Sequence, residues 1–172
     1  MTASTALDGY IGFGNLSSTG FSWNLAAPIK GNQFDLQSVA LHEISEVLGR
    51  IGMEGAAVNN HATYTPLDLF NFATPPGTLA LSPSSGYFST DNGTHNLGLF
   101  NNSAANGGDI ADWASDQSPT QAGTQGLPTG PYVGKVADAF DAFGWPGYNG
   151  DISTSDLKEM AALGYTLKVP VA

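Results

Sequence analysis

The residue types that could do chemistry are concentrated between positions 41 and 50, which read LHEISEVLGR. Residues four apart in a helix lie on one face, with Cβ atoms about 5 to 6 Å apart, so His42 and Glu46 can bind one metal ion. Glu43 follows His42 with a rotation of ~100°, which places its carboxylate beside such an ion and not on it. The spacing therefore indicates a metal site with an adjacent proton-transfer group.

The chemistry that such a site supports is hydrolysis. Zinc lowers the pKa of its water to about 7 and polarises a carbonyl oxygen, while Glu43 can take the proton of that water and pass it to a leaving amine. The pattern is HExxE where zincins have HExxH, so the carboxylate of Glu46 replaces an imidazole and makes the metal a weaker Lewis acid. The alternative is that His42, Glu43 and Glu46 are ordinary residues of a solvated helix face.

A third ligand must come from elsewhere, because Gly52 stands where metzincins have their third histidine. Asp68 is the first choice, since it lies downstream at the start of a predicted helix. A capping box of Thr65 and Asp68 would explain that carboxylate without a metal. His61 and His95 are the other candidates, because imidazole is the commonest zinc ligand and the chain has three histidines.

One amphipathic helix is expected to carry the motif. Asp35 can cap its first turn, and Gly49 or Gly52 can end it. Apolar residues recur at spacings of three and four and form a single stripe, consisting of Leu36, Val39, Ala40, Ile44, Val47, Leu48 and Ile51.

Short helices and strands are predicted around this helix. A short helix begins at Thr65 and another spans residues 153 to 163, each with a capping-box pattern at its start. Residues 7 to 29 alternate aromatic and aliphatic residues with Gly, Ser and Asn, which predicts one or two hairpins. Residues 73 to 134 are rich in Gly, Pro, Ser, Asn and Asp, which predicts short strands and long functional loops. The expectation is one α+β domain, residues 1–172, with a loop-rich C-terminal half.

Composition narrows the choice of metal and partners. The chain has no cysteine, so a transition metal must be held by His and carboxylate. Fifteen acidic against five basic residues give a net charge of −10, which repels nucleic acids and anionic membranes. Only 12% of residues are charged, as in many secreted bacterial proteins, and no apolar run approaches the ~18 residues of a membrane span.

Two oxygen-rich turns could hold a structural calcium ion. They are Asp91-Asn92-Gly93 and Gly107-Gly108-Asp109, the second followed by Asp112. Asn-Gly and Gly-Asp are also ordinary turn sequences, and this is the favoured interpretation.

The chain resembles bacterial secreted zinc metalloproteases of the zincin type, whose active-site helix reads HEISEV, then Leu or Met, then GR. The likeness continues through dispersed segments at residues 64–70, 87–91, 96–97, 107–113 and 155–165. It implies export and a zincin-like domain with a small twisted sheet packed beside the active-site helix. It also gives His42 and Glu46 the role of metal ligands and Glu43 that of the catalytic acid and base.

Members of that family usually have a signal peptide, a helix and further strands ahead of the segment that starts here, so the resemblance implies a trimmed, processed or minimal form. The expected function is a zinc-dependent endopeptidase acting on a protein or peptide held as an extended strand. Two alternatives are a non-catalytic binding or adhesion module on the same scaffold and a calcium-stabilised secreted domain. The sequence does not indicate an oligomeric state.

Overall fold

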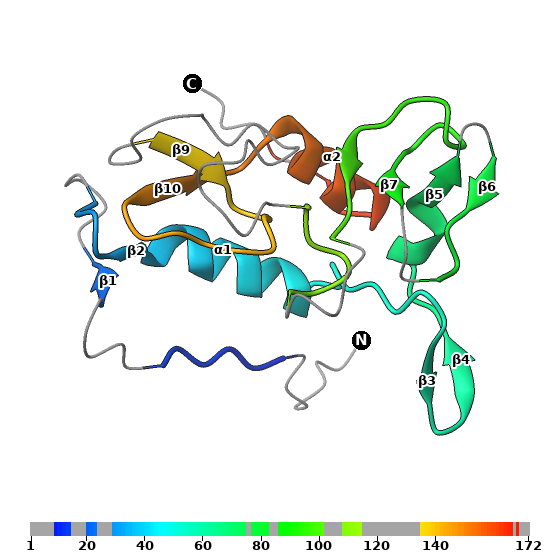
Figure 1. Ribbon diagram of the computed structural model, residues 1–172, viewed down its shortest axis with the longest axis horizontal. Coiled ribbons are helices and arrows are strands. Elements are labelled where there is room, and N and C mark those ends of the chain that lie inside the picture. Colours follow the sequence, from blue (N-terminus) through cyan, green and yellow to red (C-terminus); the bar gives the residue numbers. More distant parts are fainter. Residues whose placement is uncertain are drawn as a thin grey trace.

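The computed structural model describes residues 9–14, 20–23, 29–74, 77–82, 86–101, 108–114, 135–166 and 168. This part of the chain is a small α+β fold with two α-helices and several small sheets, which confirms the predicted class. Figure 1 shows α1 (Leu36–Val47) along one side of the molecule, with α2 (Thr154–Ala162) above it. A four-stranded sheet lies beyond the C-terminal end of α1.

The helix that carries the motif begins and ends as its sequence predicts. Asp35 is the N-cap, and its Oδ1 accepts a hydrogen bond from the Gln37 N–H at 3.1 Å. After Val47 the chain leaves the helix through Gly49, whose φ of 107° lies in the left-handed region that glycine adopts without strain. The Arg50 N–H then donates to the Ser45 carbonyl at 3.0 Å, so Arg50 is turned back toward the helix.

Two pairs of parallel strands lie near the start of α1. The strands β1 (Phe21–Ser22) and β2 (Phe34–Asp35) form one pair, and β9 (Lys135–Asp138) and β10 (Tyr148–Asp151) form the other, with β10 in contact with α1 and β2. The predicted hairpins are not found in the described part of residues 7 to 29, because β1 pairs in parallel with β2 further along the chain. Residues 7–8, 15–19 and 24–28 of that segment lie outside the described residues.

The four-stranded antiparallel sheet has the order β6-β5-β7-β8. Its strands are β5 (Asn71–Thr74), β6 (Thr78–Leu79), β7 (Tyr87–Phe88) and β8 (Gly98–Leu99). The short helix predicted from Thr65 is a single 3-10 turn, η1 (Leu67–Phe70), and it leads directly into β5. Of the predicted loop region, residues 75–76, 83–85, 102–107 and 115–134 lie outside the described part of the chain.

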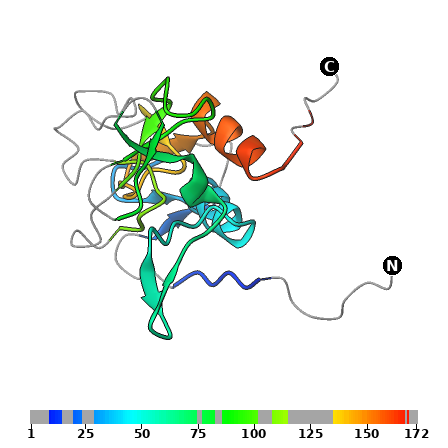
Figure 2. The same cartoon turned by 90° about the vertical axis from the view of Figure 1, so that its right-hand side faces the viewer.

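A hairpin of β3 (Ala56–Val58) and β4 (His61–Thr63) projects from the rest of the molecule, as Figures 1 and 2 both show. Asn59 and Asn60 form its turn with φ values of 50° and 65°, the combination of a two-residue hairpin loop.

The core is centred on Trp113, whose exposed fraction is 0%. Its ring stacks on Phe100 with 5.3 Å between centroids, and its Nε1–H donates to Asp156 Oδ1 at 2.6 Å. Asp156 also completes the predicted capping box of α2 with Ser153. Trp113 therefore joins the sheet to α2. Within the described residues, no helix is long and apolar enough to cross a membrane.

Candidate metal centre

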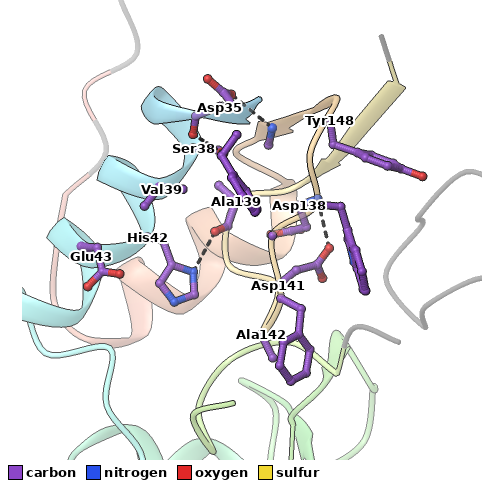
Figure 3. A pocket seen from close by; sticks show the side chains of 15 residues that line it. Asp35, Ser38, Val39, His42, Glu43, Asp138, Ala139, Asp141, Ala142 and Tyr148 are labelled. Atoms are coloured by element: carbon purple, nitrogen blue, oxygen red, sulfur yellow. Dashed lines mark hydrogen bonds between the residues drawn. The ribbon is translucent and has the colours of Figure 1, made fainter. Parts of the chain in front are cut away.

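His42 is held in one orientation by the backbone of another segment. Its Nδ1 lies 2.9 Å from the carbonyl oxygen of Ala139, and a carbonyl can only accept, so Nδ1 carries a proton and donates it. Figure 3 shows this hydrogen bond between α1 and the loop that follows β9. The other ring nitrogen, Nε2, is therefore the one available to a cation or a second proton, as is usual for a metal-binding histidine.

Two carboxylates face Nε2 of His42. Glu46 Oε1 lies 3.3 Å from it, and Asp112 Oδ1 also lies 3.3 Å from it. The three side chains offer ligand atoms that all lie within 4.8 Å of one another. Two ligands bound tetrahedrally to zinc at 2.0–2.2 Å are about 3.3–3.6 Å apart, so both distances from Nε2 of His42 fit the edges of a zinc coordination shell.

Arg50 binds both carboxylates from the buried side. Its Nη1 donates to Asp112 Oδ1 at 2.6 Å, and its Nη2 lies 3.6 Å from Glu46 Oε1. Its Nε donates to Ser45 Oγ at 2.7 Å, and its guanidinium lies 4.5 Å from the centroid of the Phe140 ring. This buried cation compensates part of the negative charge and fixes the orientation of the oxygens.

The backbone around Asp112 is fixed on two sides. The neighbouring Trp113 is the centre of the core, and the Asn101 N–H donates to the Asp112 carbonyl at 2.7 Å. A Cβ atom added at Gly52 would lie 3.1 Å from the Cβ of Ala111, which is closer than ordinary van der Waals contact. The position where metzincins have a third histidine is therefore packed against the segment that brings in Asp112.

The group stabilises positive charge. Burial disfavours the imidazolium of His42, but hydrogen bonds to Asp112 and Glu46 outweigh burial and raise the pKa of His42 to about 10. Burial likewise opposes ionisation of Asp112, yet its hydrogen bond with His42 and the charge of Arg50 lower the pKa of that carboxyl. A proton on Nε2 of His42 thus lies between two carboxylate oxygens. A divalent cation would be bound by the same two oxygens and by Nε2 itself.

Asp109 adds a further carboxyl at the exposed side of the group. Burial, then the negative charges of Asp112 and Glu46 and a hydrogen bond with Glu46, raise its pKa. His42 and Glu46 keep side-chain exposures of 17% and 22%, so solvent reaches the group.

Glu43 lies outside the cluster and lines a pocket of about 220 Å³ together with His42. One wall of the pocket is α1 with the residues before it, and the other consists of residues 138 to 150. Figure 3 shows Glu43 and His42 side by side on α1, opposite Asp138 and Asp141. The Glu43 carboxylate thus lies next to His42, at the edge of a space that a substrate could enter.

Asp68, the first choice for the third ligand, is not brought into this group. Its carboxylate accepts backbone N–H hydrogen bonds from Met53 at 3.1 Å, from Glu54 at 3.1 Å and from Thr65 at 2.6 Å. It is 2% exposed and belongs to η1. Half of the capping box is formed, because the Thr65 N–H donates to Asp68, whereas Thr65 Oγ1 donates to the Ile51 carbonyl and η1 has no side-chain cap. The three backbone donors occupy the oxygens of Asp68 that a metal would need.

His61 and His95 do not join the group either. His61 is exposed on β4, at the projecting hairpin. His95 is paired with Asp91, with 2.5 Å between Nδ1 and Oδ2, in an exposed turn. That turn contains Asn92 and Gly93 at positive φ, so the interpretation of residues 91–93 as turn chemistry accounts for their geometry.

Asp112 is the candidate ligand that reasoning from the residues did not single out. The sequence indicates Asp112 only as part of an oxygen-rich turn, because its distance from the helix along the chain gives no periodic signal. No family model matches this sequence, and searches of curated proteins and of solved structures find no match.

Proposed function

We infer that this chain is a zinc-dependent endopeptidase of the zincin type, in which His42, Glu46 and Asp112 hold the metal and Glu43 transfers protons. The observation that carries the proposal is the convergence of one imidazole and two carboxylates at zinc-like separations. The HExxE pattern and the resemblance of several segments to secreted zinc metalloproteases support the same conclusion and imply an exported protein.

The side chains have separate roles. A bound zinc ion would supply a Lewis acid and lower the pKa of a water molecule to about 7. Glu43 would accept the proton of the attacking water and deliver it to the leaving amine. The Ala139 carbonyl keeps Nε2 of His42 directed at the two carboxylates, and Arg50 holds those carboxylates in place and helps to lower the pKa of Asp112.

The first test is metal content. Protein purified without chelator and loaded with zinc should bind about one equivalent per chain, measured by mass spectrometry. Peptide hydrolysis should disappear when the metal is removed. Zinc-free protein with full peptidase activity would contradict the proposal.

The second test separates proton transfer from metal binding. Glu43→Gln should keep the zinc equivalent and lower the rate of peptide hydrolysis at least about 100-fold, because only the proton-transfer group is lost. Asp151→Asn is a matched control, since this exposed carboxylate on β10 does not line the pocket. Wild-type cleavage by Glu43→Gln would remove Glu43 from the mechanism.

One observation favours a second candidate, a non-catalytic module in which the same residues form a structural ion network. Arg50 already supplies a positive charge 2.6 Å from Asp112 Oδ1, the oxygen that faces His42. In that case zinc would neither bind stoichiometrically nor raise the melting temperature, and a broad peptide library would remain uncleaved.

A further inference from the structure

The pocket beside Glu43 contains two carboxyl groups that the proposed reaction does not use. Asp138 and Asp141 both line it, on the wall opposite α1 (Figure 3). Asp138 Oδ1 accepts a hydrogen bond from the Phe140 N–H at 2.8 Å, and Asp141 Oδ2 accepts one from the Asp138 N–H at 3.3 Å. The carboxyl group of Asp138 is also hydrogen-bonded to Ser153 and to the carboxyl group of Asp156, whereas the backbone N–H of Asp138 holds Asp141.

The second carboxylate oxygen of Asp141 indicates that the pocket binds a ligand. Asp141 is 5% exposed, and its buried Oδ1 has no hydrogen-bond partner among the described residues. Burial, followed by the negative charge of Asp138, raises the pKa of Asp141 to about 8. A buried acceptor without a donor is costly, and a positively charged donor would satisfy the oxygen and stabilise its ionised form.

The rest of the lining suits a long side chain that ends in a cation. Phe34, Val39, Phe143 and Trp145 contribute apolar and aromatic surface along the pocket. Such walls bury the methylene stem of lysine or arginine, and a guanidinium also stacks on aromatic rings. The net charge of −10 favours the approach of a cationic peptide.

The lining also favours a peptide residue over a bare metal ion. Trp145 Nε1 is a second buried polar atom with no partner in the described part of the chain. It is a donor, so a metal ion cannot satisfy it, whereas a peptide residue brings a carbonyl oxygen as well as a cation.

We propose that this pocket is a subsite for a lysine or arginine side chain of the peptide substrate, with Asp141 and Asp138 as its counter-charges. The proposal rests on the peptidase function proposed above, because it places the cationic residue next to the peptide bond that Glu43 serves. Binding to the pocket itself can be measured without any cleavage.

Calorimetry with two small probes, each with both termini blocked and uncharged, tests the subsite directly. N-acetyl-arginine amide should bind wild-type protein at least about tenfold more tightly than N-acetyl-citrulline amide, which has nearly the same shape without the charge. Asp141→Asn should remove this difference, whereas Asp151→Asn should keep it. Equal affinity of the two probes for wild-type protein, or no binding of either, overturns the proposal, as does stoichiometric calcium binding that displaces the arginine probe.

Cleavage of a peptide library by zinc-loaded protein then separates the two proposals. Cuts concentrated beside lysine and arginine support the subsite. Efficient cleavage without that preference overturns the subsite and leaves the peptidase function intact. Tight binding of the arginine probe without any cleavage keeps a cation-binding pocket and contradicts the peptidase function.

Discussion

Arg50 and Asp112 form an ion pair of 2.6 Å between two side chains that are almost closed to solvent, with exposures of 0% and 4%. One partner follows the C-terminal end of α1, and the other precedes the core residue Trp113. The pair thus ties the helix that carries His42 to the distant segment that supplies the third donor. The proposed metal centre and the packing of the fold depend on the same contact.

Breaking this pair should destabilise the protein strongly. Arg50→Gln leaves the buried carboxylate of Asp112 without its counter-charge, so the free energy of unfolding should fall by about 3–5 kcal/mol. Urea titration measures the change. Lys158→Gln is the matched control, because this basic residue is exposed on α2 and its replacement should cost little. A loss for Arg50→Gln no larger than that of the control would show that the ion pair contributes nothing.

The choice of third ligand is tested by Asp112→Asn. An amide oxygen is a much poorer zinc ligand than a carboxylate, so zinc affinity should fall at least about 100-fold in a titration against a competing chelator. The surface variant Asp151→Asn should bind zinc as wild type does. Unchanged affinity in Asp112→Asn would require another ligand and would disprove the assignment.

Asp68→Ala should lower the stability of the protein but leave its zinc affinity unchanged. Removing the carboxylate leaves the N–H groups of Met53, Glu54 and Thr65 without their acceptor, and the free energy of unfolding should fall by about 2–4 kcal/mol. Zinc affinity at a temperature where the variant is folded should match wild type. A large loss of zinc affinity in the folded variant would return Asp68 to the metal centre.

The local parts of this site could be predicted from the sequence. Asp35 as a cap, the apolar stripe of α1, and His42 four residues before Glu46 all follow from helix geometry over a few residues. Asp112 could not be found in this way, because only the burial of Trp113 and the ion pair with Arg50 bring it to the helix. The one signal was indirect: residues 107–113 belong to the segments that resemble the metalloprotease family.

Asp68 lies outside the cluster for a related reason. A carboxylate near the start of a predicted helix has two uses, as a ligand and as an acceptor for backbone N–H groups, and the sequence alone does not rank them. In the structure Thr65 and the segment at Met53 supply those donors.

The hairpins predicted near the start of the chain are also not found among the residues described there. The strand β1 pairs with β2 in parallel, because strand pairing depends on which segments meet in space and not on alternation within one of them.

Glu159 on α2 should make the stability of the fold depend on pH. Its side chain is fully buried, and neither carboxyl oxygen has a hydrogen-bond partner among the residues that the structure describes. Burial raises its pKa well above 4.5; Arg50 opposes this shift, while the nearby carboxylates of Asp156, Asp112 and Asp138 add to it. The folded state therefore holds a proton that the unfolded state releases as the pH rises above 4.5.

The stabilising effect of that proton is fully present below pH 4.5 and is lost as the pH rises toward the pKa of the folded state. Over this interval the free energy of unfolding should fall by about 1.4 kcal/mol per pH unit for each such proton. Glu159→Gln keeps the shape without the titration, so its stability should fall less steeply than that of wild type between about pH 5 and pH 8. Urea titrations across this range, with Asp151→Asn as the exposed surface control, measure the difference. Parallel curves for wild type and Glu159→Gln would mean that Glu159 titrates in the folded protein as it does in the unfolded chain.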